Sequence, residues 1–287
     1  MTARRRAWSR DWQLVLPITL FFVAFVFVPL GLLAVVSFHD DPEIHTPGVA
    51  QYVKFVTDRF NVAVLGQTLW LGWLATLLAL VIGYPLAYLY VLAPPALQRG
   101  LMLVIVLPLL TSAVVRTFAW VAILGRQGIV NSALLGLGWT DTPVRLIYTP
   151  WAVVVALAQI QLPLLVLPVI TALGNIDPNL APASHVLGAG RWRTFVAITL
   201  PLSAPGLLAG CLLVYAASVS AFVTQTLVGG GQLMLMPQYM YQQAIQANNY
   251  PFAAAIAMIL LVSVLAIVTA VNLVSRRSRA FVSELPT

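Results

Sequence analysis

The stretch Asn175–Pro201, NIDPNLAPASHVLGAGRWRTFVAITLP, is a polar interruption between two apolar runs that are each longer than a membrane span. It begins with Asp177-Pro178, which is typical of a helix start, and its Gly188-Ala189-Gly190 segment is typical of a helix end. Two arginines follow, and a final Leu-Pro pair opens the next apolar run. A basic, helical loop between membrane spans indicates a surface that is offered to something in the cytoplasm.

Composition indicates that lipid surrounds most of the chain outside this loop. The chain has 287 residues, of which 61% are hydrophobic and 8% are charged, whereas a soluble domain averages about 25% charged residues. Several apolar runs approach or exceed the ~18 residues that a helix needs to cross a bilayer. These runs are continuous rather than alternating, so we expect helices and not a barrel.

The apolar runs predict an all-α integral membrane protein with six transmembrane helices. The first run is too long for the apolar region of a signal peptide, so we expect it to be a retained helix. The expected spans are Leu14–Val36, Thr68–Val91, Leu101–Leu124, Trp151–Leu173, Leu200–Leu227 and Phe252–Val274.

Basic residues set the expected orientation of these spans, because they are concentrated in cytoplasmic loops. With both termini in the cytoplasm, the cytoplasmic side carries ten of them, namely Arg4, Arg5, Arg6, Arg10, Arg99, Arg191, Arg193, Arg276, Arg277 and Arg279. The outer side carries four, namely Lys54, Arg59, Arg126 and Arg145. The asymmetry also explains the net charge of +7 without a nucleic-acid partner, which we do not expect.

The stretch suggests a short helix that runs from Pro178 towards Leu187, with the Asp177 side chain at its N-cap. Its small and apolar side chains form either a docking surface for a partner or a face that packs back onto the protein's own helices. The residues alone leave these two alternatives open.

The same stretch resembles the cytoplasmic signature loop of ABC importer permeases, whose pattern is Glu-Ala-Ala, three residues, Gly-Ala, and a later Ile-x-Leu-Pro. Gly188-Ala189 and Ile198-Thr199-Leu200-Pro201 match this pattern, but Pro182 stands where the family has glutamate. In that family the loop forms the coupling helix that seats on the cytoplasmic ATPase. The resemblance implies this role for Leu180, Pro182, Ala183, Ser184, His185, Leu187, Gly188 and Ala189.

Because a proline inside a helix costs about 3 kcal/mol unless it lies in the first turn, Pro182 suggests a helix that restarts after Pro178.

Further motifs are similar to permeases of the spermidine/putrescine type. They are GYPLAY from Gly83, VRTFAW from Val115, LGRQG from Leu124, NS from Asn131, AFVT from Ala221 and LVGG from Leu227. The resemblance covers nearly the whole chain after the first span, and the motifs occur in the expected topological order.

This resemblance implies a type I ABC importer permease in a bacterial inner membrane, with lipid around it and no enzymatic activity of its own. It implies three protein partners: a cytoplasmic ABC ATPase, a second permease subunit (similar or identical) and an extracytoplasmic solute-binding protein. The expected solute is a polyamine or a related small organic molecule. The implied single domain spans residues 1–287, with cytoplasmic ends 1–13 and 275–287, a first helix and outer loop 14–62, and a five-helix core 63–274 that contains the coupling loop 174–199.

Four polar side chains inside the expected spans are candidates for the translocation path or its gate. Arg116 is an intramembrane charge, which is costly and therefore suggests a function, although its side chain can also reach the outer interface. Gln159, Thr224 and Gln225 either form hydrogen bonds between helices or face a wet path.

Two other classes of protein fit less well. An ion-coupled secondary transporter is the alternative, but no Asp or Glu lies inside an expected span to bind a coupling ion. A membrane enzyme would need clustered catalytic or metal-binding groups, whereas His39, His45 and His185 are scattered and Cys211 is alone. The sequence therefore predicts no catalytic, metal or cofactor site.

Overall fold

The computed structural model describes the backbone of residues 3–283 and the side chains of residues 16–274. The arginines that precede residue 16 or follow residue 274 lie outside these described side chains, so the expected cytoplasmic ends stay a prediction. The chain divides into two compact units, one of residues 1–62 and 239–266 and one of residues 63–238 and 267–287. Each unit is described by itself.

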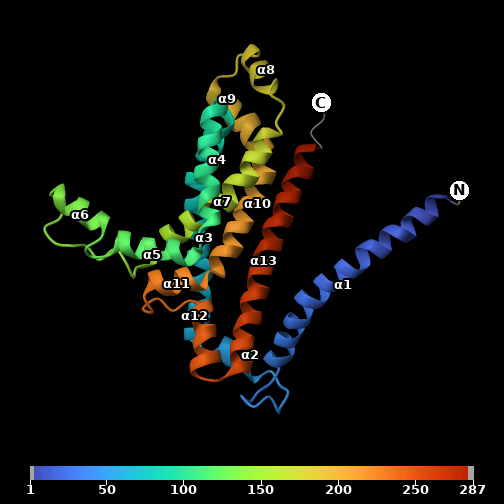
Figure 1. The fold of residues 1–287 in the computed structure, drawn as a ribbon, viewed down its shortest axis with the longest axis vertical. Coiled ribbons are helices and arrows are strands. Elements are labelled where there is room, and N and C mark those ends of the chain that lie inside the picture. The colour runs from blue at the N-terminus through green and yellow to red at the C-terminus, as the bar shows by residue number, and fades with distance from the viewer. Residues whose placement is uncertain (1–2, 284–287) are drawn as a thin grey trace. The chain divides into compact units, whose positions relative to one another are not determined.

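The described residues are helical apart from turns and one isolated bridge between His39 and Pro47 (Figure 1). The helices are α1 (Ala3–Ser37), α2 (Ala50–Thr57), α3 (Arg59–Leu92), α4 (Pro95–Leu110), α5 (Ala113–Leu124), α6 (Ile129–Gly136), α7 (Pro150–Gly174), α8 (Leu180–Val186), α9 (Arg191–Thr194), α10 (Leu200–Val219), α11 (Phe222–Gly229), α12 (Met236–Tyr241) and α13 (Tyr250–Ser283). Two π-helical segments are η1 (Phe195–Thr199) and η2 (Gln242–Gln246).

Among the described residues, six helical segments are long and apolar enough to cross a membrane, as the sequence predicts. They are Leu16–Ser37, Arg59–Leu92, Ala113–Gly136, Pro150–Gly174, Arg191–Val219 and Tyr250–Val274. The second and fifth segments begin about two and a half turns before the expected spans, at Arg59 and Arg191.

The prediction of one continuous helix over the third span, Leu101–Leu124, was wrong. The structure ends α4 at Leu110 and starts α5 at Ala113. Thr111 adopts extended backbone angles, and Ser112 caps the new helix by accepting a hydrogen bond from the Val114 N–H at 3.3 Å. Two hydroxyl-bearing residues therefore interrupt a run that hydropathy alone treats as unbroken.

The expected fifth span, Leu200–Leu227, also has different ends. Helix α9 and η1 extend it on one side, while α10 ends at Val219 and α11 restarts at Phe222. Outer regions expected to be loops contain the short helices α2, α6 and α12 and the segment η2. Local helices inside a loop give too weak a periodic signal to be found by hydropathy.

Helix α7 is the centre of the second unit, because more than half of its apolar window is buried, at 56%. Helix α10 packs along it through two glycines four residues apart. A β-carbon at Gly206 would lie 2.5 Å from the Pro168 carbonyl oxygen, and one at Gly210 would lie 3.0 Å from Leu165 Cα. Such small residues let membrane helices approach closely, so this spacing fixes the α7–α10 contact.

In the first unit, the apolar window of α1 is 0% buried, so lipid or another protein must cover it. The loop after α1 is ordered by local contacts. The Ser37 hydroxyl lies 2.6 Å from the Tyr52 hydroxyl, and the Lys54 ammonium lies 4.4 Å from the centre of the Phe252 ring.

Candidate functional site

The loop between α7 and α10 starts with an Asx turn. The Asp177 carboxylate accepts a hydrogen bond from the Asn179 N–H at 2.9 Å, and the Asp177 carbonyl accepts one from the Leu180 N–H at 3.1 Å. Helix α8 then begins at Leu180, so Pro182 lies in its first turn. N–H groups in a first turn have no partner within the helix, so this proline removes no hydrogen bond. The expected start at Pro178 was therefore two residues too early, and the N-cap is Asn179 instead of Asp177. The helix does not restart at Pro182, because no helix precedes Leu180 in this loop.

Helix α8 ends where the glycine signal predicted. The N–H of Gly188 donates to the His185 carbonyl at 3.0 Å, and the N–H of Ala189 donates to the Ser184 carbonyl at 3.0 Å. This pair of bonds is a Schellman motif, and it requires the left-handed backbone of Gly188, whose φ is +83°. The ring nitrogen Nδ1 of His185 is 2.8 Å from the Ala189 carbonyl oxygen and reinforces the turn.

One hydroxyl pair fixes α8 to the next helix. Ser184 Oγ and Thr194 Oγ1 share a hydrogen bond of 2.7 Å, and both residues are buried. Thr194 was not among the predicted site residues, because its ten-residue separation from Ser184 carries no periodic signal. Figure 1 shows α8 and α9 together at one end of the second unit.

The other predicted coupling residues are on the outside of this loop. Leu180, Pro182, Ala183, His185, Leu187 and Gly188 are exposed, and Ala189 is half-buried. The apolar tip of α8 is especially open, with Val186 88% and Leu187 87% exposed. The helix therefore does not pack its tip back onto the described part of the second unit, which favours the docking alternative.

Two candidate path residues are buried and form hydrogen bonds with other residues of this chain. Thr224 Oγ1 on α11 lies 2.9 Å from Thr117 Oγ1 on α5. Gln225 is 2% exposed, and its Nε2 donates to the carbonyls of Ser218 at 2.7 Å and Val219 at 3.3 Å. These carbonyls end α10, where the Ser218 carbonyl also accepts from the Ala221 N–H at 3.3 Å, so Gln225 joins the helices α10 and α11.

Arg116 joins α5 to the backbone of α7. Its Nη1 donates to the carbonyl oxygen of Ile160 at 2.9 Å. Pro163 lies in the next turn of α7 and has no N–H to offer the Gln159 carbonyl four residues before it. Arg116 therefore donates to the backbone of α7 near this proline, and the contact positions the start of α5.

Gln159 differs from the other three candidates because it is exposed in the middle of the mostly buried α7. Its Oε1 accepts a hydrogen bond of 3.0 Å from the Trp120 indole N–H on α5. The face that α5 and α7 share near Gln159 is therefore polar and open. The sequence analysis did not single out Trp120, although it follows Arg116 by one helical turn.

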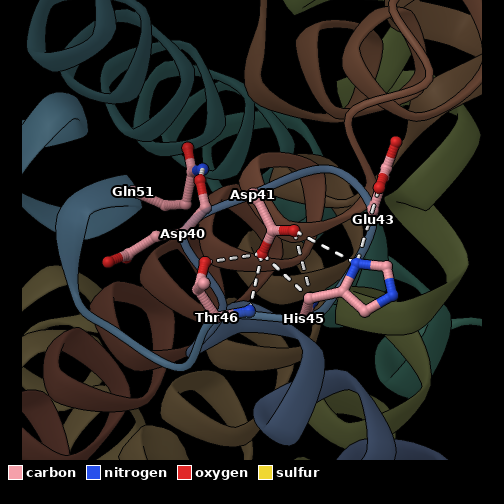
Figure 2. A network of polar contacts seen from close by, with 6 residues as sticks. All are labelled: Asp40, Asp41, Glu43, His45, Thr46 and Gln51. Atoms are coloured by element: carbon pink, nitrogen blue, oxygen red, sulfur yellow. Dashed lines mark hydrogen bonds and ion pairs between the residues drawn. The ribbon is translucent and has the colours of Figure 1, made fainter.

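An acidic loop in the first unit was not among the predicted site residues (Figure 2). The Asp41 carboxylate accepts hydrogen bonds from the Thr46 N–H at 2.8 Å and from the Thr46 hydroxyl at 2.7 Å. These two bonds, followed by that of the His45 N–H, lower the pKa of Asp41 to about 2. The His45 ring lies 3.6 Å from Asp41 and 3.5 Å from Glu43, and its side chain is 73% exposed. The bonds within this network order the loop.

The fold and the loop define a polytopic helical transport subunit with an exposed loop helix. Residues 79–279 match the model of the family described as binding-protein-dependent transport system inner membrane component. The chain belongs to this family.

Relatives and a solved structure agree with this assignment. The chain is 34% identical over 244 residues to the spermidine/putrescine transport system permease protein PotB of Salmonella typhimurium, covering 81% of this chain and 82% of that protein. It is 32% identical over 253 residues to PotB of Escherichia coli, covering 84% and 89%. A bacterial ABC transporter involved in alginate import has the same fold, with a TM-score of 0.75 and 22% identity over 95% of this chain and 99% of that chain.

Family membership confirms the main predictions. The chain is a multi-span permease subunit of the bacterial inner membrane and is not an enzyme, because ATP hydrolysis in these systems belongs to a separate chain. Its all-helical fold is that of an ABC importer permease.

Proposed function

We propose that this permease forms half of the pathway through which an ABC importer moves a polyamine, spermidine or putrescine, or a related small organic solute. The observation that supports this most is the 34% identity to a spermidine/putrescine permease over 81% of the chain. An extracytoplasmic binding protein delivers the solute, as the family description implies. A second permease, similar or identical, supplies the other half of the pathway.

The exposed tip of α8 docks on the cytoplasmic ATPase. Val186 and Leu187 project from a helix whose two ends are fixed, by the Asp177 turn and by Gly188. The buried Ser184–Thr194 pair fixes the same helix to α9. A rigid support under an apolar tip is what a docking surface needs to transmit a movement instead of absorbing it.

The proposed docking requires the loop 174–199 to lie in the cytoplasm and, with six spans, both termini on the same side. The charge asymmetry supports the same orientation. The first helix and outer loop, residues 14–62, precede the five-helix core, residues 63–274. The exposed side chains of α1 meet lipid or the second permease.

Gln159 is the candidate path residue that the geometry favours, because its side chain is exposed within the apolar helix α7 and is oriented by Trp120. Arg116, Thr224 and Gln225 hold the broken helices around this face. They act as gate supports, and Arg116 does not bind a cationic solute, which its charge would repel.

Uptake of radiolabelled spermidine and putrescine tests the substrate. A bacterial strain without polyamine importers receives the chain together with its operon neighbours. We expect ATP-dependent uptake that is lost when the binding protein is omitted. Uptake that continues without the binding protein and stops when the proton gradient is collapsed would instead support an ion-coupled transporter. Absence of uptake of both polyamines, with all subunits assembled, would refute spermidine and putrescine as the solutes.

A further inference from the structure

We propose that Phe195 is the positioning residue that transmits movement of α8 into the membrane core. This inference rests on the proposed docking of α8 on the ATPase. Phe195 begins the π-helical segment η1, directly after Thr194. It is half-buried, and it lies between the loop and α3.

The first link in this path is the buried hydroxyl pair. Ser184 on α8 and Thr194 on α9 share a hydrogen bond of 2.7 Å, and they are 7% and 6% exposed. The Ser184 hydroxyl also bonds to the Ala181 carbonyl and the Thr194 hydroxyl to the Gly190 carbonyl, so a buried network ties α8 to α9 and the two move as one piece. A displacement of α8 therefore reaches the residue that follows Thr194 in the chain, Phe195.

The second link is a set of ring contacts between Phe195 and α3. The ring centre of Phe195 lies 5.4 Å from that of Tyr88 and 5.9 Å from that of Tyr84, and both pairs are edge-to-face at 76°. Tyr84 and Tyr88 are four residues apart and share one face of α3. The edge-to-face orientation is a favoured one for aromatic rings. When Phe195 moves, we therefore expect the two tyrosine rings to move with it.

The third link joins α3 to α10. The Tyr84 hydroxyl lies 2.9 Å from the Ser203 hydroxyl, and Ser203 is 0% exposed. Helix α10 in turn packs on α7 through Gly206 and Gly210. The contacts therefore form a continuous route from the loop to the two central helices, which is the physical requirement for coupling between distant sites.

The surroundings of Phe195 leave it able to move. A groove of about 770 Å³ opens beside it and is lined by Tyr88, His185 and Trp192 among others. The π-helical segment η1 separates α9 from the regular helix α10, and π-helical turns occur frequently at functional sites. The Phe195 ring can therefore move between two hydrogen-bonded pairs, Ser184–Thr194 and Tyr84–Ser203, and can pass a displacement from one to the other.

Three variants separate this role from a purely structural one. Phe195→Leu keeps an apolar side chain but removes the ring contacts, and Phe195→Tyr restores a ring. Trp192→Leu is the matched control, because Trp192 stacks on Phe195 from outside and is 76% exposed. Each is assembled with the native ATPase, partner permease and binding protein in proteoliposomes, where ATP hydrolysis and spermidine transport are measured together.

We expect Phe195→Leu to bind the ATPase and hydrolyse ATP at the parent rate while transporting about tenfold less spermidine per ATP. Phe195→Tyr and Trp192→Leu should keep the parent ratio of transport to hydrolysis. A ratio in Phe195→Leu equal to the parent ratio would overturn the inference. Equal losses of hydrolysis, transport and thermal stability would assign Phe195 to the packing of the fold and overturn it as well.

A second measurement needs no transported solute. Gln159→Cys, in a chain whose Cys211 is replaced by serine, is labelled with a maleimide, with and without ATP and vanadate. We expect nucleotide to change the labelling rate when Phe195 is present and not in the Phe195→Leu background. A nucleotide response that persists with Phe195→Leu refutes the role of Phe195 alone. A parent that binds no ATPase refutes the proposed coupling function, and this inference with it.

Discussion

The contact between α7 and α10 yields the most quantitative prediction, through the substitution Gly206→Ala. A β-carbon at Gly206 would lie 2.5 Å from the Pro168 carbonyl oxygen, and it would also clash with the Ala172 β-carbon. The oxygen belongs to the backbone of α7 and cannot rotate away, so the two helices must separate. Gly66→Ala on α3 is the matched control, because nothing lies within 4 Å of its added β-carbon.

The magnitude follows from two opposing effects. Replacing a helical glycine by alanine stabilises the helix by about 1 kcal/mol, and both variants gain this contribution. Overpacking a tight helix contact costs about 1–3 kcal/mol, and only Gly206→Ala bears this cost. The free energy of unfolding of the two variants should therefore differ by about 1–3 kcal/mol, with Gly206→Ala the less stable.

Thermal melting in detergent, followed by the fraction that stays monodisperse on size exclusion, measures this difference. We expect Gly206→Ala to melt several degrees below Gly66→Ala, since about 1 kcal/mol shifts the melting temperature by ~2–4 °C at this size. Equal melting temperatures, or a more stable Gly206→Ala, would refute the tight α7–α10 contact.

Three further predictions concern polar side chains. Gln225→Leu leaves the Val219 carbonyl without its side-chain donor and the Ser218 carbonyl with backbone donors only, so the unfolding free energy should fall by about 1–3 kcal/mol in thermal melts; unchanged stability with altered uptake would instead place Gln225 in the solute path. Gln159→Ala should change stability by no more than about 0.5 kcal/mol yet raise the KM for uptake, because the side chain is exposed; an unchanged KM would remove Gln159 from the path. Asp41 has its pKa lowered from 3.8 to about 2, so its ionised form stabilises the loop above pH 4 and this stabilisation is lost as the pH falls through 2. Cleavage of the loop by pepsin should accelerate over that interval, and the acceleration should be absent in Asp41→Asn.

The sequence predicted the long spans because uninterrupted apolar runs admit few alternatives in lipid. It failed at the break between Leu110 and Ala113, because Thr111 and Ser112 are tolerated within membrane helices. Only their backbone angles and the Ser112 cap end one helix and begin another. Pro108, which removes a hydrogen bond near this point, was the available signal.

In the candidate site, too, features set by neighbours in sequence were predictable, whereas those set by contacts between distant helices were not. The C-terminal end of α8 was predictable, because Gly188 acts on its own neighbours in sequence, and the start was predicted to within two residues from the Asp177 turn. The partners of Arg116 and Gln225 were not, because a polar side chain in an apolar run satisfies backbone carbonyls as readily as it faces water. Which of these occurs depends on where other helices break.

The central claim is that the exposed tip of α8 docks on a separate ATPase, and co-purification tests it most directly. The affinity-tagged chain is expressed with its operon neighbours as the parent, as Leu187→Glu and as Leu137→Glu. Leu187 is 87% exposed on the tip, whereas Leu137 is 67% exposed just after α6. We predict that an ATPase stays with the parent and with Leu137→Glu and is lost from Leu187→Glu. An ATPase that remains bound to Leu187→Glu, or that binds none of the three, would contradict the account.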